Sequence, residues 1–450
     1  MDNELSELVG QLDETLIASH RDDRELFAEL DRSQVELGIV SGDRPFSQFL
    51  RPQFFTRRRY AEIVRASEVL AAAFDTMAMA ALENDEIMAD LGLTETEEKY
   101  ARIDPGYSGV CNSSRLDAFF AGDDFKFLEY NGETPAGISD QLQIEKVLAK
   151  IPEVGEFLRK HRHWLPQPHV KLLEGLVNDY RNFGGGKEKP NIAIVDWKGV
   201  STSTEFDVLQ EYFESQGHRT MIADPAALEY DGEMLRIGDF DVDIFYKRVL
   251  IHEFFERSPD DHPLLCAYRD GNVFMANSFR TKIPHKKASF AVVSNDKYAD
   301  LFTAEQHEMI RKHIPWTRRV SDRQTGYQGE TVDLLEFISR ERDRFILKPN
   351  DDYGGAGIIV GWESSEAEWD AAIDLALAEP YVVQERVPVE KVRFPAYGET
   401  ASLVELLIDI DPFIFKGKVE GGLVRLAASS LVNVAAGGGE TALVVLEDVG

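Results

Sequence analysis

The sequence of 450 residues has little cysteine, little positive charge and no long apolar run. Its two cysteines, Cys111 and Cys266, exclude a disulfide framework and a cysteine zinc site, and they are typical of a reducing, cytoplasmic compartment. No stretch approaches the roughly 18 uninterrupted apolar residues of a transmembrane helix, so no membrane partner is expected. The first residues also lack the basic and apolar segments of a signal peptide.

Basic residues are scarce relative to acidic ones, with 49 Lys and Arg against 80 Asp and Glu and a net charge of -31. A nucleic-acid partner is not expected, because phosphate contacts need clustered Lys and Arg. The balance fits a cationic or neutral ligand, or equally a solvated acidic surface. Hydrophobic residues make up 43% of the chain, which is enough for a sizeable core. The length predicts roughly two to four domain-sized units.

The pattern divides the chain into four regions. Residues 1–98 show helical periodicity, and 99–187 combine a predicted β-hairpin with further helices. Residues 188–280 alternate short apolar strands with helices and predict a small α/β unit with a partly parallel sheet. Residues 281–450 hold most of the remaining strands and a glycine-rich segment.

The glycine-rich segment lies between two apolar strands, from Phe345 to Gly361. The first strand ends in Lys348, an acidic pair that includes Asp352 follows, and then comes a run of glycines. These glycines are Gly354, Gly355 and Gly357. Glycine lets the backbone approach phosphate oxygens, and the lysine supplies a positive charge for them. The segment fits a lid over phosphates, or equally a plain hairpin with a glycine-rich turn.

A second segment with chemical potential is the predicted hairpin around residues 112–135. In extended strands Arg115 and Asp117 share one face, and so do Glu129 and Asn131. Carboxylate and amide oxygens without Cys or His suit a hard cation such as Mg²⁺. The alternative is a surface ladder of salt bridges.

Basic and polar residues elsewhere complete the candidate set. The pair Lys286 and Lys287 adjoins an apolar segment, so one of the two lysines is expected to face inward. The neighbouring His285 is expected to be an ordinary surface histidine. A strand that contains Gln384 and Glu385 runs into a linker that is stopped by proline. Arg425 follows a later strand, where its fork of donors suits a carboxylate or a phosphate.

These motifs stand in a recognisable order. Arg-x-Asp is followed by Glu-x-Asn, Lys-Lys, Lys-Pro with the glycine segment, and Gln-Glu-Arg-Val. Over residues 100–450 this order resembles the circularly permuted ATP-grasp ligases, such as eukaryotic-type glutathione synthetase and the synthetase domain of glutathionylspermidine synthase. The resemblance implies a permuted ATP-grasp fold of mixed α/β class, with an inserted small α/β domain of the pre-ATP-grasp kind and a helical N-terminal region.

The resemblance also implies roles for residues at matching positions. Mg²⁺ would be held by Asp117, Glu129, Asn131 and Asp352. The phosphates of ATP would be bound by Lys348, by Lys287 or Lys286, and by the lid glycines Gly354, Gly355 and Gly357. Adenine would lie against Gln384, Glu385 and Val387, and the ribose would meet Glu405. Arg115 would stabilise the charged intermediate, and Arg425 would lie at the substrate end with Gly437–Gly439.

The activity implied is an Mg-ATP-dependent carboxylate–amine ligase. A small carboxylic acid attacks ATP to give an acyl phosphate, an amine then attacks the acyl carbon, and ADP and phosphate are released. Two alternatives remain open: an ATP-binding regulator or scaffold of the same fold, and an enzyme that phosphorylates its acceptor without ligation. No amidase activity is expected. The sequence identifies neither the acid, the amine nor the oligomeric state.

Overall fold

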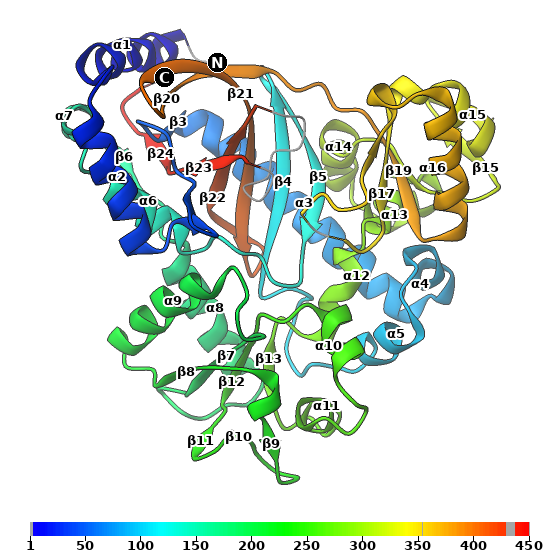
Figure 1. The fold of residues 1–450 in the computed structure, drawn as a ribbon. Helices are drawn as coiled ribbons and strands as arrows, with labels where there is room; N and C mark the ends of the chain where they lie inside the picture. Colours follow the sequence, from blue (N-terminus) through cyan, green and yellow to red (C-terminus); the bar gives the residue numbers. More distant parts are fainter. Residues whose placement is uncertain (1–2, 353, 429–436, 450) are drawn as a thin grey trace.

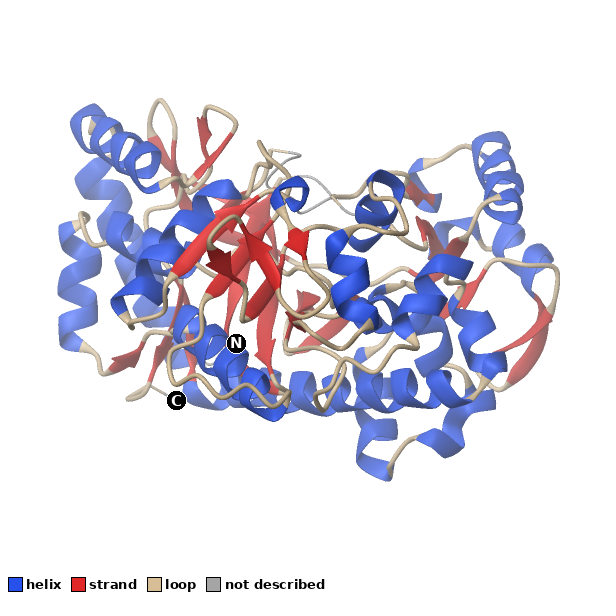
Figure 2. Cartoon of the chain, turned by 90° about the horizontal axis from the view of Figure 1, so that it is seen from below, coloured by secondary structure: helices blue, strands red, loops and turns tan. Residues whose placement is uncertain are grey.

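The computed structural model describes residues 3–352, 354–428 and 437–449. The chain is organised around a central antiparallel sheet, which is flanked by a small α/β lobe and by a lobe that carries the glycine-rich segment (Figure 1). We call these parts the central sheet, the α/β lobe and the lid lobe. Seen from below, a large group of strands lies in the middle of the molecule with helices on both sides of it (Figure 2).

The central sheet joins segments that are far apart in the sequence. Its strand order is β23-β22-β21-β4-β5, and β20 pairs with β21. All of these pairings are antiparallel. The strands are β4 (Ser113–Ala121), β5 (Asp124–Asn131), β20 (Lys391–Tyr397), β21 (Ala401–Phe415), β22 (Lys418–Ala427) and β23 (Gly439–Thr441). The predicted hairpin is confirmed as β4 and β5, in which Arg115 pairs with Asn131 and Asp117 with Glu129.

A helix of 27 residues, α3 (Arg57–Glu83), supports this sheet. It is rich in Ala and has no internal Gly or Pro, as a long helix requires. Its buried stripe includes Leu70, Phe74 and Met77 and shares one core with β4, β5 and β21. The helix also contacts α12 (Lys282–His285), α13 (Ala288–Val293) and α14 (Ala304–His313). It therefore ties the central sheet to the lid lobe (Figure 1).

The N-terminal region contains strands as well as the predicted helices. The helices are α1 (Asn3–His20), α2 (Arg24–Leu37), α4 (Asp85–Leu91) and α5 (Glu95–Ala101), and the short strands are β1 (Val40–Ser41), β2 (Arg44–Pro45) and β3 (Gln53–Thr56). β3 pairs in parallel with β24 (Leu443–Leu446), which also pairs with β6 (His163–Trp164). Helices α6 (Asp140–Leu148) and α7 (Pro152–Lys160) pack on α2 and α1. The two ends of the chain thus lie close together (Figure 1).

The α/β lobe confirms the predicted small α/β unit, and its main sheet is parallel throughout. The order is β13-β12-β7-β8. The strands are β7 (Ile192–Val195), β8 (Thr220–Ala223), β12 (Ile244–Lys247) and β13 (Phe274–Ala276), with a small sheet of β9 (Glu229–Tyr230), β10 (Leu235–Ile237) and β11 (Phe240–Asp241). The helices are α8 (Pro168–Asn182), α9 (Ser203–Ser215), α10 (Ile251–Arg257) and α11 (Pro263–Arg269). The lobe shares a buried core with Phe413 and Phe415 of β21.

The lid lobe is built on a four-stranded antiparallel sheet with the order β14-β19-β17-β18. These strands are β14 (Thr317–Arg319), β17 (Phe345–Pro349), β18 (Ile359–Val360) and β19 (Tyr381–Glu385). Beside them lie β15 (Gln324–Tyr327), β16 (Glu330–Asp333), α15 (Leu334–Arg340) and α16 (Glu366–Ala378). The helix α16 begins at a capping box of Ser365 and Glu368, which matches the sequence pattern.

None of the helices in the described part of the chain combines the length and the apolar character that crossing a membrane requires.

Gly361 provides a test of the lid lobe's packing. A Cβ atom there would lie 2.2 Å from the carbonyl oxygen of Arg342 and 2.7 Å from that of Phe345. We expect Gly361→Ala to lower the free energy of unfolding by about 1–3 kcal/mol, because backbone must move to admit the methyl group. Gly326→Ala is the control, since a Cβ at Gly326 meets nothing within 4 Å. Urea unfolding with equal losses for both variants would contradict this account.

Candidate functional site

The hairpin of β4 and β5 brings its four polar residues together. Asn131 Nδ2 donates to Asp117 Oδ1 at 2.9 Å, and Arg115 Nε donates to the same oxygen at 3.0 Å. Burial opposes the ionisation of Asp117, but Arg115 and Arg425 outweigh it and lower its pKa to about 2. The carboxylate is therefore ionised at neutral pH, as a ligand of a hard cation must be.

Arg425, on β22, faces three carboxylates with one nitrogen. Its Nη2 lies 2.9 Å from Asp117 Oδ2, 2.7 Å from Asp409 Oδ2 and 2.8 Å from Asp411 Oδ2. The two partners on β21, Asp409 and Asp411, are not among the site residues predicted from the sequence. Their signal was the alternation of Asp409 and Asp411 within the apolar stretch Leu406–Phe415, which puts both on one face.

The carboxylates on this face outnumber the arginines. Burial raises the pKa of Asp409 to about 6 and holds that of Asp411 well above its ordinary value, although Arg425 opposes both shifts. Farther along the face, Glu440 of β23 and Asp140 of α6 share a hydrogen bond. Burial raises the pKa of Asp140 to about 7 and also raises that of Glu440. The arrangement depends on Arg115 and Arg425 for its positive charge.

Lys287 and Lys348 lie next to the hairpin from the other side. Lys287 Nζ is 3.0 Å from Glu129 Oε1, and although burial opposes the ionisation of Glu129, Lys287 and Lys348 together lower its pKa. Lys348 Nζ donates to Gln384 Oε1 at 2.8 Å and is 3.4 Å from the carbonyl oxygen of Leu128 on β5. Burial lowers the pKa of Lys348 to about 8, although Glu129 acts in the opposite direction.

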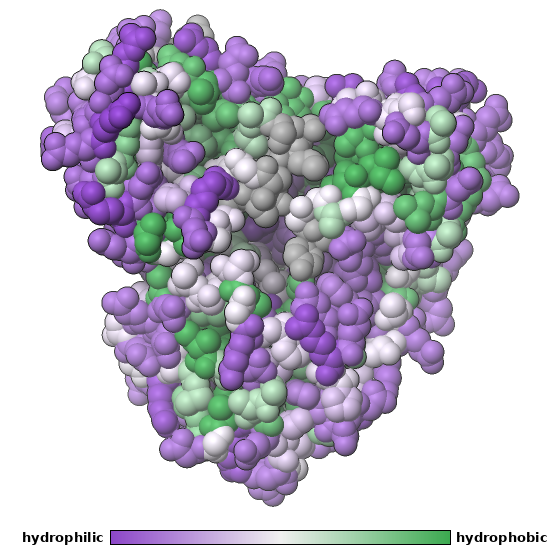
Figure 3. All heavy atoms as spheres, in the orientation of Figure 1, coloured by the Kyte–Doolittle hydropathy of each residue, from purple (hydrophilic) through white to green (hydrophobic). Residues whose placement is uncertain are grey.

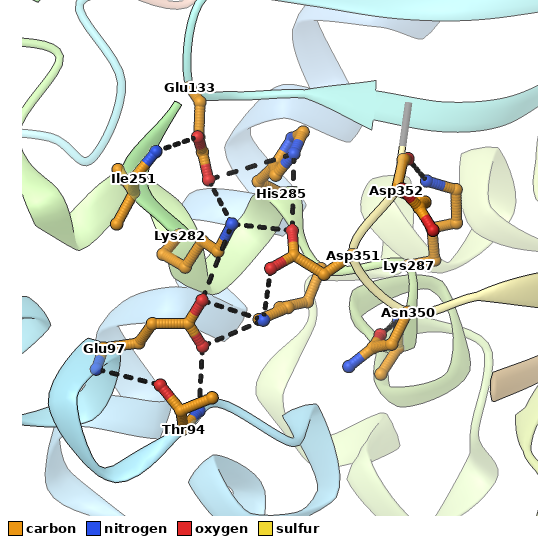
Figure 4. A network of polar contacts seen from close by, with 12 residues as sticks. Thr94, Glu97, Glu133, Ile251, Lys282, His285, Lys287, Asn350, Asp351 and Asp352 are labelled. Atoms are coloured by element: carbon orange, nitrogen blue, oxygen red, sulfur yellow. Dashed lines mark hydrogen bonds and ion pairs between the residues drawn. The ribbon is translucent and has the colours of Figure 1, made fainter. Parts of the chain in front are cut away.

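Lys286 points into a different environment from Lys287. Its Nζ lies 2.9 Å from Glu97 Oε2 and 2.7 Å from Asp351 Oδ2, as Figure 4 shows for the surrounding network. Of the two lysines that the sequence left as alternatives, Lys287 therefore faces the hairpin. The prediction that His285 is a surface histidine is wrong, because only 8% of this residue is exposed. Burial lowers the pKa of its imidazole.

The glycine-rich segment connects β17 to β18, and Tyr353 lies outside the described residues. Gly354, Gly355 and Gly357 have φ values of 66°, 81° and 67°, in the left-handed region that favours glycine. A Cβ at Gly357 would also lie 2.6 Å from Pro349 Cγ. Asp352 accepts a hydrogen bond from Lys287 Nζ at its backbone oxygen, at 2.5 Å.

The residues predicted to face adenine and ribose lie on β19, the linker that follows it, and β21. The Gln384 side chain lies between Lys348 and Thr317. Glu385 accepts from the Tyr327 hydroxyl at 2.6 Å, and its backbone N–H donates to the oxygen of Trp316 at 2.8 Å. Among the described residues, the N–H of Val387 has no backbone acceptor. Glu405 is exposed on β21 and by alternation shares the face of Asp409.

Two groups of side chains carry donor atoms that a metal ion could use. Glu133, His285 and Asp351 lie close enough to hold one, but Lys282 Nζ lies 2.5 Å from Glu133 and 2.6 Å from Asp351 and already supplies a cation there. Asp117, Glu129 and Asn131 supply carboxylate and amide oxygens from one hairpin, and both carboxylates are ionised. These carboxylates also have cationic partners, Arg115 and Arg425 for Asp117 and Lys287 for Glu129, but the partners contact them from the two sides of the hairpin. This donor set fits Mg²⁺.

The surface is hollowed at the middle of the molecule, where the lobes meet (Figure 3). The hairpin strands β4 and β5 and the lid-lobe strand β17 converge on this region (Figure 1). The structure thus brings Arg115, Asp117, Glu129 and Asn131 together with Arg425 on one side and with Lys287 and Lys348 on the other.

No protein-family model matches the chain. A protein of Frankia alni, named as a candidate glutamate–cysteine ligase, is 26% identical over 359 residues, which cover 74% of this chain and 38% of that protein. An uncharacterised protein of Mycobacterium tuberculosis is 24% identical over 335 residues, which cover 70% of this chain and 56% of that protein. The chain therefore spans only part of the length of the curated relatives it matches.

One solved structure is similar over almost the whole chain. It is a glutathione synthetase-like effector from Globodera pallida in its apo form, with a TM-score of 0.59, 14% identity, and coverage of 93% of this chain and 96% of that one. At this identity the likeness shows the fold, which is that of a glutathione synthetase-like protein. The predicted resemblance to glutathione synthetase is confirmed to that extent, and the resemblance to glutathionylspermidine synthase stays a prediction.

The cluster around Arg425 generates a test of stability. We expect Arg425→Met to lower the free energy of unfolding by about 3–5 kcal/mol at pH 7.5, because three buried carboxylates lose their shared cation. The loss should shrink at pH 5.5. A carboxyl whose pKa is raised by folding, such as Asp409 with a pKa of about 6, destabilises the fold as pH rises through that value and is relieved by protonation below it.

Urea unfolding at the two pH values measures this effect. Arg340→Met, on the exposed face of α15, is the matched control and should change the free energy of unfolding by less than about 0.5 kcal/mol. A loss for Arg425→Met that is the same at both pH values would contradict the role assigned to Asp409 and Asp411.

Proposed function

We propose that the chain is an Mg-ATP-dependent carboxylate–amine ligase that forms an acyl phosphate and releases ADP and phosphate. The observation that carries the proposal is the meeting of an oxygen-rich hairpin with two lysines and a glycine-rich segment. Lys287 contacts Glu129 directly, and Lys348 approaches the neighbouring Leu128. Cation ligands and phosphate-binding groups thus share one site. The ligase name of the Frankia relative agrees with this reading.

We further propose that the fold is an ATP-grasp fold in permuted order. The metal-binding hairpin precedes the lid in the sequence, yet it pairs with β21, which follows the lid. The order of motifs in permuted ATP-grasp ligases has the same arrangement. The α/β lobe then corresponds to the inserted pre-ATP-grasp-like domain.

The nucleotide is bound, on this proposal, between the central sheet and the lid lobe. Lys287 and Lys348 carry positive charge for the phosphate oxygens, and the left-handed glycines let backbone N–H groups face the same oxygens. At the adenine end, the N–H of Glu385 is used by Trp316, so Val387 is the residue that offers a backbone donor. Glu405 is exposed and available to a ribose hydroxyl.

Mg²⁺ would be held by Asp117, Glu129 and Asn131, with Asp352 added from the lid segment. When bound, Mg²⁺ neutralises charge on the phosphates that it shares with the protein. The chain's part is to keep the ligands ionised and in place. Arg115 and Arg425 do so for Asp117, and Lys287 does so for Glu129.

The two arginines also suit the ligation chemistry. Attack of a carboxylate on the γ-phosphorus places negative charge on the phosphoryl and leaving oxygens, and attack of an amine on the acyl carbon places it on the acyl oxygen. A fixed guanidinium stabilises such charge. Arg115 is fixed by Asp117 and by the carbonyl oxygen of Ala136, 2.8 Å from its Nη1. Arg425 is fixed by Asp409 and Asp411. Because the acid is activated by ATP, the reaction needs no serine or cysteine nucleophile.

Titration calorimetry with a non-hydrolysable ATP analogue tests the nucleotide site. We expect magnesium-dependent binding to the unsubstituted protein and at least a tenfold loss of affinity in Lys348→Ala, because the phosphates lose a buried positive charge. Lys391→Ala, at an exposed position on β20, should bind as the unsubstituted protein does. If the unsubstituted protein does not bind the analogue, the proposed function is wrong.

A second assay separates ligation from its alternatives. ADP release is measured against a panel of acids and amines, beginning with L-glutamate and L-cysteine because of the relative's name. Hydroxylamine added in place of the amine should trap the acyl phosphate as a hydroxamate. Binding of ATP without turnover across the panel would favour a regulator, and a stable phosphorylated product would favour phosphorylation without ligation.

The pKa of Lys348 predicts how nucleotide binding depends on pH. Since burial lowers this pKa to about 8, the ammonium is the main form at pH 7 and is lost as pH rises through 8. We expect the affinity for the ATP analogue to fall severalfold between pH 7 and pH 9. Lys348→Arg should flatten this dependence, because a guanidinium stays charged. An affinity that falls equally in both proteins would show that another group controls it.

A further inference from the structure

A buried network of ion pairs lies beside the proposed nucleotide site and takes no part in the chemistry described above (Figure 4). Lys282 Nζ lies 2.5 Å from Glu133 Oε1, 2.6 Å from Asp351 Oδ1 and 3.6 Å from Glu97 Oε1. Lys286 Nζ joins Glu97 to Asp351. The side chain of Lys282 has no exposed surface, so it is held by the protein and does not reach a ligand.

The carboxylates of this network come from three separate segments. Glu97 belongs to α5, Glu133 follows β5, and Asp351 follows β17. Both lysines are carried by α12 and the residue that follows it. The central ammonium of Lys282 therefore connects the N-terminal region, the hairpin segment and the lid segment.

Each part of the network adjoins a residue of the proposed site. Glu133 comes just after Asn131, Asp351 lies between Lys348 and Asp352, and Lys286 precedes Lys287. A backbone hydrogen bond also connects the Lys286–Lys287 segment to the lid segment, because the N–H of Lys287 donates to the oxygen of Asn350 at 3.0 Å. A shift in the network would therefore move the metal ligands relative to the phosphate-binding lysines.

Stability alone is a weak explanation for this network. Two ammonium groups and three carboxylates must be removed from water to bury this network. Apolar side chains of similar volume commonly give a core of equal or greater stability. Buried ion pairs do fix a geometry, because each partner must be met at a set distance and angle. Their placement at the junction of the site-bearing segments fits that role.

We propose that Lys282 is a positioning residue of the nucleotide site, and that it sets the separation between the metal-binding hairpin and the lid segment by holding Glu133 and Asp351 together. The inference rests on the proposed function, since it concerns the same Mg-ATP site. Glu133 is itself fixed, because its Oε2 accepts from the N–H of Ile251 in the α/β lobe at 2.9 Å.

The network also gives the N-terminal region a part in the site. Thr94 and Glu97 form a capping box at the start of α5, in which the N–H of Thr94 donates to Glu97 Oε2 at 2.8 Å. Glu97 in turn holds Lys286, next to Lys287. The fold of residues 94–97 thus supports the placement of a phosphate-binding lysine.

The test compares magnesium-dependent and magnesium-independent binding of a non-hydrolysable ATP analogue by calorimetry. In Lys282→Met we expect the gain in affinity on adding Mg²⁺ to fall at least ~10-fold, because displaced ligands no longer meet the metal and the phosphates together. Binding without Mg²⁺ should change less than about threefold, since the adenine contacts lie on β19 and its linker. Glu133→Gln, which keeps the side chain's shape, should also reduce the gain in affinity on adding Mg²⁺.

Lys416→Met is the matched control. It also removes an ammonium from a buried carboxylate, because Lys416 Nζ lies 2.9 Å from Asp179, whose side chain has no exposed surface. We expect Lys416→Met to lower the free energy of unfolding measured in urea and to leave the magnesium-dependent gain in affinity unchanged. Equal loss of magnesium-dependent affinity in Lys282→Met and Lys416→Met, or no loss in Lys282→Met and Glu133→Gln, would overturn the positioning role. Absence of binding to the unsubstituted protein would instead overturn the nucleotide site on which it rests.

Discussion

The antiparallel pairing of β4 with β21 is the constraint on which the rest of the site depends. It sets Arg115 opposite Phe413 and Phe119 opposite Asp409, so a hairpin from early in the chain lies beside strands from its last part. Arg425 then reaches across β21 to Asp117. Without this pairing the hairpin would hold its own polar residues but would lack the second arginine, and Asp411 would lose its contact with Arg115.

Two charged clusters flank the place where chemistry is proposed, and they differ in kind. The cluster on the sheet face is poor in cations and leaves carboxylates with raised pKa values. The cluster beside the lid has a lysine at its centre, and the pKa of Glu133 is lowered to about 2, because Lys282, His285 and Lys247 together outweigh burial. Between them, Glu129 and Lys287 form the contact that joins the hairpin to the lid side. The charges of the two sides meet at Glu129, whose pKa Lys287 lowers and Asp117 raises.

Local patterns were enough to predict the elements that carry the site. Alternation identified the hairpin with its facing residues, and the glycine run identified the turn between β17 and β18. What could not be predicted depends on contacts between distant segments. The pairing of Asp409 with Arg425 needs the register of β21 and β22, and the burial of His285 needs the position of α12 under the lid segment. The strand β3 was missed because Gln53–Thr56 is too short to show a period.

The parallel pairing of β3 with β24 has a consequence for how the chain folds. Parallel strands so far apart in sequence close a very large loop, and such contacts form late and slowly. While the polypeptide is being synthesised, the partner of β3 leaves the ribosome long after β3 itself. Until then Phe54 and Phe55, which are buried in the finished structure, are without this strand partner. The topology therefore requires that Phe54 and Phe55 be shielded during synthesis.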